Sequence, residues 1–354
     1  MYLCINTFQP PSSHSWRETA DGHWTGVMGR RVWTLTQTDD TLWYHVYRPQ
    51  DGQVEGGDRK RSEERIEGAL KKEEEERVAV TWDTEEEEAM LRDYFQLNVN
   101  MGDLYMKWGA ADPHFRDIAE LFKGVRMLRQ DPTECLFSII CTSNNNISRI
   151  HGMVERLCGA LGTPLCQLDE TFYYDFPSLS ALADNSVEAR LRDLGFGYRA
   201  QFLQQSAEKI LKSHGLQWLE DLRSIPYLQA HEALRTLPGV GSKVADCVCL
   251  MSLDKPEAVP VDTHVWQIAK RDYDYASDNK QKSITDKLYR KIGNFFRELW
   301  GPYAGWAQSV LFCADLRKFQ KLKDVPHLKQ ELKEENAEEE SVACKKAKVK
   351  KEEN

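Results

Sequence analysis

Apolar and polar side chains alternate along two short runs near the amino terminus. Val32-Trp33-Thr34-Leu35-Thr36 and Leu42-Trp43-Tyr44-His45-Val46-Tyr47 are separated by the polar segment Thr38-Asp39-Asp40. An alternation of period two is typical of a half-buried strand, and a short polar segment between two such runs is typical of a turn. The pattern over residues 24–47 therefore predicts an antiparallel hairpin or meander.

Apolar side chains recur at helical spacing from residue 89 onward. Ala89-Met90-Leu91 begins this pattern, and the run from Phe115 to Phe122 continues it. Asp131-Pro132-Thr133-Glu134 combines an N-cap acid, a proline at the first helical position and a following acid, so a helix begins there. Further helices are predicted at 148–161, 186–194, 198–211, 228–237, 242–252, 263–271 and 285–300. We see little strand signal between residues 131 and 317, so the fold class is α+β, a mainly helical core with an amino-terminal antiparallel sheet.

Negative charge is concentrated in one segment. The 354 residues carry a formal net charge of −9, and the 15 acidic and 7 basic residues at positions 50–88 account for −8 of it. This segment contains tetraglutamates at 73–76 and 85–88 and few apolar residues, so it cannot bury enough surface to offset the entropy of ordering. We expect most of it to be a disordered insert, and the nearly neutral remainder is compatible with a polyanionic partner.

The end of the chain is also rich in charge. From residue 321 onward there are 9 basic and 9 acidic residues, and the lysine cluster 345–351 comes near the end. A dense cationic run is what nuclear import and weak nucleic-acid contact both require, whereas a solvated lysine tail is the alternative. We predict a mixed α/β domain at 1–130 interrupted by the insert at about 50–88, a helical domain at 131–320 and a disordered tail at 321–354.

Composition argues against several classes of protein. The nine cysteines show no Cys-x-x-Cys spacing, which disfavours zinc ribbons, iron–sulfur loops and a disulfide scaffold. No apolar run reaches the roughly 18 residues of a membrane span, and no secretory signal is evident. We therefore expect a soluble intracellular protein with no membrane partner and no bound metal.

A glycine-rich turn is the most informative local pattern. Leu237-Pro238-Gly239-Val240-Gly241 lies between two predicted helices, and Lys243 falls in the first turn of the second. Glycines let a ligand approach the backbone, and the amides at a helix N-terminus favour an anion. Gly239, Val240 and Gly241 are thus candidates for holding a nucleic-acid phosphate without reading bases, and an ordinary helical corner is the structural alternative. The ending of a P-loop is absent.

An aspartate follows the lysine at a distance of 19 residues. Val259-Pro260-Val261-Asp262-Thr263-His264 places Asp262 directly before a predicted helix. A helix N-cap is sufficient to explain an aspartate there. The same carboxylate is also suited to face the cationic carbon that forms when a glycosidic bond breaks.

The turn, the lysine and the Val-Pro-Val-Asp-Thr-His segment together resemble the helix–hairpin–helix DNA glycosylase superfamily. Other segments resemble the eukaryotic 8-oxoguanine DNA glycosylases specifically, over most of residues 24–317 outside the insert. These segments are Ser143-Asn144-Asn145-Asn146-Ile147-Ser148-Arg149-Ile150, Gly195-Phe196-Gly197-Tyr198-Arg199-Ala200, Asp246-Cys247-Val248-Cys249-Leu250-Met251 and Gly301-Pro302-Tyr303-Ala304-Gly305-Trp306-Ala307-Gln308. The resemblance implies a bifunctional enzyme that excises 8-oxoguanine opposite cytosine and then nicks the strand.

The resemblance assigns the chemistry to two residues. Lys243 would be the nucleophile, and we expect burial and the positive end of its helix to favour its neutral form. It would expel the damaged base and hold the opened sugar as a Schiff base while β-elimination breaks the strand. Asp262 would stabilise positive charge on the sugar. A lone lysine and a lone N-cap aspartate are otherwise structural.

The resemblance also implies a pocket for the extruded base. Cys247 and Met251 lie one and two turns beyond Lys243 and share its helix face. With Gln308 and Phe312 they would hold the base, and a thiol paired with the lysine would give the pocket a dipole. Packing in the core is the alternative for Cys247, Met251 and Phe312.

DNA contacts outside the pocket are implied in the same way. Asn144 and Arg149 would read the orphaned cytosine, with Tyr198 as a wedge beside it and Arg199 in the same group. At least one amide of the triple asparagine 144–146 is also expected to cap a turn. His264 would contact a phosphate, and Asp315 would help to organise the pocket.

One departure from the family pattern concerns recognition of the lesion. The family carries Gly-Gln-Ser-Phe-Arg-Trp near the amino terminus, whereas this chain has Pro11-Ser12-Ser13-His14-Ser15-Trp16. Proline fixes the backbone differently, so the discriminating carbonyl contact is in question. Two alternatives follow, a helix–hairpin–helix protein that only binds DNA, and a glycosylase for formamidopyrimidine lesions. The chemistry requires no cofactor, although a monovalent cation could sit on the hairpin carbonyls. We expect a monomer that acts on double-stranded DNA containing oxidised guanine in the nucleus, with a mitochondrial form as an option.

Overall fold

The computed structural model describes residues 16–38, 41–47, 81–143, 145, 147–275 and 283–315. This part of the chain begins with an antiparallel sheet whose strands follow sequence order. The strands are β1 (Arg17–Ala20), β2 (His23–Met28), β3 (Arg31–Gln37) and β4 (Leu42–Tyr47). The meander predicted over residues 24–47 is confirmed, and β1 extends it by one strand.

The two faces of this sheet pack against different elements. Trp33 and Leu35 of β3 face helix α2 (Thr81–Tyr94), where they form a small core with Leu91. Val32 comes directly before Trp33 in β3 and faces the other way, packing with Tyr173. Successive residues of a strand point to opposite faces, and both faces of this sheet are covered.

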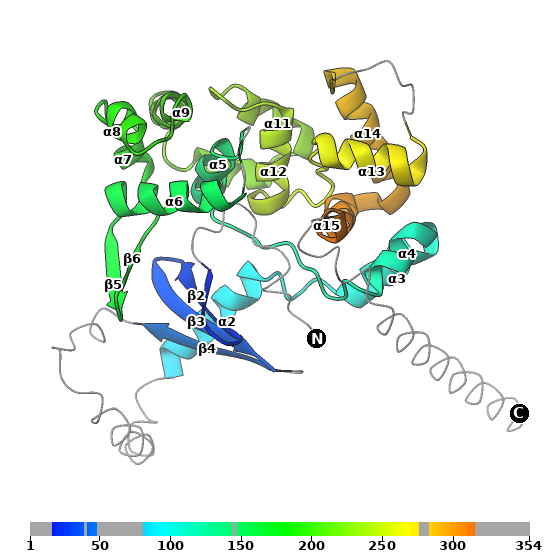
Figure 1. Cartoon of the computed structure of the whole chain (residues 1–354), viewed down its shortest axis with the longest axis horizontal. Coiled ribbons are helices and arrows are strands. Elements are labelled where there is room, and N and C mark those ends of the chain that lie inside the picture. The colour runs from blue at the N-terminus through cyan, green and yellow to red at the C-terminus, as the bar shows by residue number, and fades with distance from the viewer. Residues whose placement is uncertain are drawn as a thin grey trace, which may run out of the picture.

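A second hairpin covers the face of the sheet opposite α2. It consists of β5 (Pro164–Leu168) and β6 (Thr171–Tyr174), and Figure 1 shows it reaching from the helical part toward the strands. The expectation of little strand structure between 131 and 317 is wrong at this hairpin. Its strands are short and alternate weakly, and they are stabilised by packing on the sheet rather than by a strong local pattern.

The predicted end of the disordered acidic insert, at about residue 88, is wrong, because helix α2 already begins at Thr81. Glu85 to Glu88 lie within this helix, and Glu86 forms an ion pair with Arg31 of β3 at 2.8 Å. Glutamate is a good helix former, and the helix is anchored by its apolar contacts with the sheet. The rest of the insert, at 50–80, and the tail at 321–354 lie outside the described residues.

The remaining helices share one core, and in Figure 1 most of them lie above the sheet, with α3 and α4 to one side of it. Their bounds are α3 (Met101–Ala111), α4 (Pro113–Ala119), α5 (Pro132–Ile140), α6 (Ile147–Leu161), α7 (Leu179–Leu182), α8 (Val187–Asp193), α9 (Arg199–Ser213), α10 (Trp218–Asp221), α11 (Tyr227–Arg235), α12 (Ser242–Ser252), α13 (Thr263–Tyr273), α14 (Asp286–Trp300) and α15 (Ala304–Asp315), with short 3-10 turns at Leu222–Ser224 and Gly301–Tyr303. The α+β fold class is confirmed. The predicted start of α5 is also confirmed, because the Asp131 side chain accepts a hydrogen bond from the backbone N–H of Glu134 at 2.9 Å.

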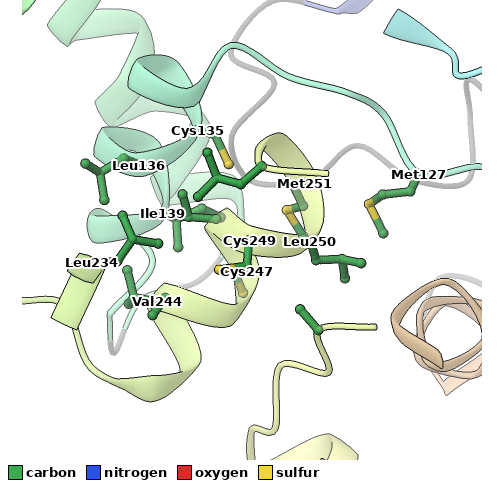
Figure 2. Packing of buried hydrophobic residues seen from close by; sticks show 14 of the residues in the cluster. Met127, Cys135, Leu136, Ile139, Leu234, Val244, Cys247, Cys249, Leu250 and Met251 are labelled. Carbon is green, nitrogen blue, oxygen red and sulfur yellow. The ribbon is translucent and has the colours of Figure 1, made fainter. Parts of the chain in front are cut away.

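Helix α12 lies in the middle of this core. All its residues from Val244 to Ser252 are buried, and Figure 2 shows side chains of α5 and α11 packed against one side of it. A helix enclosed in this way has little freedom to shift, because protein interiors are closely packed. Side chains at its amino-terminal end are therefore held in fixed positions. No helix in the described ranges is long and apolar enough to cross a bilayer.

Candidate active site

The glycine-rich turn connects α11 to α12. Gly239 has a φ of +75°, and a Cβ at this position would lie 2.5 Å from the Phe202 ring, so both the backbone and the space require glycine. The space beside Gly241 is open, and α12 begins at the next residue. The first amides of a helix have no partner within it, so this turn presents N–H groups to an anion.

Lys243 and Asp262 meet at the start of two helices. Lys243 lies in the first turn of α12, and its Nζ is 3.4 Å from Oδ2 of Asp262. The other carboxylate oxygen, Oδ1, accepts hydrogen bonds of 3.0 Å from the backbone N–H groups of His264 and Val265 and so caps α13. The structural and the catalytic interpretations of Asp262 are therefore compatible, because each uses a different oxygen.

The lysine is an ammonium ion in this DNA-free state. Burial lowers the pKa of Lys243, but nearby Cys247 and Asp262 raise it by more, so the net change is upward. The side chain is also 45% exposed, which weakens the effect of burial. The expectation that burial and the helix end keep Lys243 neutral is therefore wrong here, and the amine must lose a proton before it can attack.

A cavity of about 100 Å³ opens beside this pair. The four residues predicted for the base pocket line it together with the pair itself, and they come from α12 and α15: Cys247, Met251, Gln308 and Phe312. Cys247 and Met251 share a helix face with Lys243, as their four-residue spacing predicts. The structure thus brings together every residue of the predicted pocket.

The Cys247 thiol does not form the predicted ion pair with the lysine in this state. Burial raises the pKa of Cys247 to about 12, although the charge of Lys243 opposes the rise. A thiol with such a pKa is protonated at neutral pH, so the pocket has no thiolate–ammonium dipole. The residue is 7% exposed, and desolvation outweighs the neighbouring charge.

Other residues of the cavity were not predicted. They are Ile139, Thr142, Leu250, Pro260, Val265 and Ser309. Leu250 lies seven residues after Lys243, so helical periodicity was a usable signal for it. Ile139 and Thr142 come from α5 and the turn after it, and their place in the site depends on how α5 packs against α12. No local pattern could have found them.

The residues expected to read the opposite base lie around the start of α9. Tyr198 is 47% exposed, and its hydroxyl donates to the Ser143 carbonyl at 3.1 Å. Arg149 is exposed and contacts the Gly195 carbonyl at 3.4 Å. Both side chains therefore reach the surface, as a wedge and a reader require.

Arg199 lies differently from what its assigned role suggests. It is only 4% exposed, and its guanidinium donates to the Ser143 carbonyl through Nε and Nη2. Reading a cytosine would require it to leave this carbonyl. Asn144 lies outside the described residues. The capping role expected of one asparagine is confirmed for Asn145, whose amide donates to the Cys141 carbonyl at 3.1 Å.

His264 and Asp315 differ in their relation to the cavity. His264 is exposed at the start of α13, and its ring packs edge-on against Phe312, with 6.1 Å between centroids. It therefore lies beside the pocket and can reach an approaching phosphate. Asp315 is not among the residues that line the cavity and instead accepts a hydrogen bond from Arg271 at 3.0 Å. In the described part of the chain, no group of three or more His, Cys, Asp and Glu side chains could hold a metal ion.

Two family models match most of the sequence. Residues 3–136 match the N-terminal domain of 8-oxoguanine DNA glycosylase, and residues 137–294 match the HhH-GPD superfamily of base excision DNA repair proteins. The second match contains α11, the glycine turn, α12 and Asp262. It ends before the helix that supplies Gln308 and Phe312 to the cavity.

Two proteins named as N-glycosylase/DNA lyases are similar to this chain in sequence. The N-glycosylase/DNA lyase OGG1 of Arabidopsis thaliana is 41% identical over 228 residues, which cover 64% of this chain and 61% of that protein. The N-glycosylase/DNA lyase of Saccharomyces cerevisiae is 39% identical over 250 residues, covering 64% of this chain and 66% of that protein. The match therefore spans slightly less than two thirds of the length of each relative.

A solved structure extends the comparison to the fold. The 8-oxoguanine glycosylase/lyase of Clostridium acetobutylicum, in complex with double-stranded DNA containing cytosine opposite 8-oxoguanine, is 25% identical with a TM-score of 0.64. The alignment covers 89% of this chain and 90% of that one. Together with the two family models and the sequence relatives, it shows that this chain belongs to the 8-oxoguanine DNA glycosylase family within the HhH-GPD superfamily of base excision repair proteins.

Proposed function

We propose that this protein is a bifunctional DNA glycosylase and lyase that removes 8-oxoguanine opposite cytosine and then breaks the strand at the resulting abasic site. The observation that carries this proposal is the pair formed by Lys243 and Asp262, 3.4 Å apart at the edge of a cavity. An amine and a carboxylate at the mouth of a pocket are the groups that a glycosylase with lyase activity needs. The names of the relatives support the same activity.

The first chemical step requires the lysine to lose its proton. DNA over the site would cover a side chain that is now 45% exposed, and burial favours the neutral amine. Neutral Nζ then bonds to the anomeric carbon as the bond from that carbon to the base breaks. The electrons of the broken bond leave with the base, which takes up a proton. Asp262 lies where its charge stabilises the cationic sugar while this happens.

The second step follows from the bond between lysine and sugar. Opening of the sugar ring gives a protonated imine between Nζ and the former anomeric carbon. Loss of a proton from the neighbouring carbon lets the 3′ phosphate leave with the electrons of its bond to the sugar. Water then hydrolyses the imine and restores the amine. Lysine is required throughout this sequence, because it stays bonded to the sugar until hydrolysis.

Recognition of DNA would use the surface around the pair. Phosphates would lie against the amides after Gly241 and beside the exposed His264. Extrusion of the lesion leaves a gap in the stack, and the exposed Tyr198 ring is suited to fill it beside the orphaned cytosine. The extruded base would enter the cavity between Cys247 and Phe312. We further propose that the protein acts as a monomer in the nucleus.

Excision measured with enzyme in excess over duplex tests the proposal. The duplexes would carry 8-oxoguanine, formamidopyrimidine or normal guanine opposite cytosine, or 8-oxoguanine opposite adenine. We expect base release and a nicked strand to be fastest for 8-oxoguanine opposite cytosine, and Lys243→Gln to bind this duplex without releasing base. Faster release of formamidopyrimidine would change the substrate, and saturable binding without product on any duplex would show that the protein only binds DNA.

A further inference from the structure

A second, buried network involves a residue of α12 that does not line the base cavity. Its centre is Asp246, three residues after Lys243 and 1% exposed. The carboxylate oxygens have separate donors. Oδ1 accepts a 2.7 Å hydrogen bond from the hydroxyl of Tyr227 on α11, and Oδ2 accepts one from the hydroxyl of Tyr289 on α14. Asp246 therefore ties the helix that carries the lysine to helices on both sides.

The Tyr289 hydroxyl makes a second contact that reaches the other half of the catalytic pair. It accepts a hydrogen bond from the backbone N–H of Val261 at 3.3 Å, and Val261 immediately precedes Asp262. The Tyr289 side chain is 9% exposed, so water competes little for these bonds. One hydroxyl thus connects α12, through Asp246, to the backbone that places Asp262.

Tyr227 offers a matched comparison. Its hydroxyl also donates to Asp246. However, this hydroxyl accepts a hydrogen bond from Nη1 of the Arg297 side chain, at 3.5 Å, rather than from a backbone N–H group. Each tyrosine therefore gives Asp246 one hydrogen bond, and only Tyr289 is also bonded to the segment of Asp262. The two tyrosines, with Asp246 and Arg297, line a separate cavity of about 400 Å³.

We infer that Tyr289 is a positioning residue for the reaction, because its hydroxyl holds the segment of Asp262 at a fixed distance from the helix of Lys243. It touches neither substrate nor the reacting atoms. The inference rests on the proposed function, in which Lys243 and Asp262 act as a pair. Misplacement of a catalytic group by about 1 Å can slow a reaction on the order of 100-fold, so loss of one remote hydroxyl is sufficient to reduce the rate.

The test compares Tyr289→Phe with Tyr227→Phe in the full chain. Single-turnover excision would be measured over a range of enzyme concentrations, which separates the maximum rate from the concentration at half-saturation. We expect Tyr289→Phe to lower the maximum rate about 10- to 100-fold with half-saturation within about twofold of wild type. Tyr227→Phe should stay within about threefold of the wild-type maximum rate, since the loss of one hydrogen bond to Asp246 alone leaves the Asp262 segment in place.

Two kinetic results would overturn the inference. One is a Tyr289→Phe enzyme with the wild-type maximum rate, and the other is a Tyr227→Phe enzyme that is equally slow, which would indicate a general loss of packing. If Tyr289→Phe is unstable, both variants are assayed at a lower temperature at which circular dichroism shows them folded, and equal maximum rates of the two variants there would overturn the inference. If the wild-type protein releases no base, the proposed function fails, and a crystal structure of Tyr289→Phe still tests the inference. An unchanged distance of 3.4 Å between Lys243 Nζ and Asp262 Oδ2 would contradict it.

Discussion

Substitution of Asp262 by asparagine should separate the two functions of this side chain. The carbonyl oxygen of asparagine can replace Oδ1 and keep the hydrogen bonds from the N–H groups of His264 and Val265. The amide group then faces Lys243 without a negative charge. Alanine at the same position removes both the cap and the charge.

The structure sets the size of each effect. Charges 3.4 Å apart attract by about 5 kcal/mol at an effective dielectric constant of ~20 and by about 1 kcal/mol in water. Because Lys243 is 45% exposed, the lower figure applies to the DNA-free protein. An N-cap contributes about 1 kcal/mol, so we expect Asp262→Ala to be less stable than Asp262→Asn by that amount. DNA bound over the site would exclude water, so loss of the charge that faces the cationic sugar should slow excision on the order of 100- to 1,000-fold.

Chemical denaturation and single-turnover excision of 8-oxoguanine measure the two effects independently. Both variants should be slow to a similar degree, while only Asp262→Ala loses the stability of the cap. The reasoning is refuted if Asp262→Asn excises the base within about threefold of the wild-type rate. It is also refuted if the less stable Asp262→Ala is much slower than Asp262→Asn, because both variants lack the charge.

Three further predictions concern the glycine turn, the lysine and the thiol. Gly239→Ala should destabilise the protein by about 1–3 kcal/mol, because φ at this position is +75° and the new Cβ would collide with Phe202. Gly241→Ala, where φ is −94° and the space is open, should leave the stability unchanged and weaken DNA binding. Thermal unfolding and DNA titration measure the two effects, and equal stability of the two variants would contradict the expectation. Because the pKa of Lys243 is raised and attack needs the neutral amine, strand cleavage at a preformed abasic site should become faster from about pH 6 to 9, and a rate that falls over this range would be inconsistent with a lysine nucleophile. Because burial raises the pKa of Cys247, iodoacetamide at neutral pH should leave this thiol unmodified while it alkylates the half-buried Cys166. Peptide mass spectrometry would detect the modified cysteines, and rapid alkylation of Cys247 would mean that its thiol ionises despite burial.

Local signals were strong enough to predict most helices from the sequence. Asp131 and Pro132 marked the start of α5, and the predicted bounds of α12 are those observed. The β5–β6 hairpin was missed because its stability depends on contacts such as that of Tyr173 with Val32, which are distant in sequence. Likewise Glu86 looks like part of a disordered acidic run until its partner Arg31 is known.

The residue content of the candidate site was predictable, but its protonation was not. Helical spacing placed Cys247 and Met251 beside Lys243, and the resemblance to a family supplied Gln308 and Phe312 from a distant helix. The charge of a thiol or an amine depends on burial and on neighbours in space. Cys247 and Asp262 together raise the pKa of Lys243, and burial raises that of Cys247, so both expectations about charge failed for the DNA-free protein.

The most direct test of the catalytic lysine is chemical trapping followed by peptide mapping. Borohydride reduces an imine to a stable amine, so reaction of the protein with an 8-oxoguanine duplex in its presence should join protein and DNA covalently. After digestion of both, mass spectrometry should find the sugar remnant on the peptide that contains Lys243. A remnant on another amine, or an equal yield of adduct from Lys243→Gln, would contradict the account.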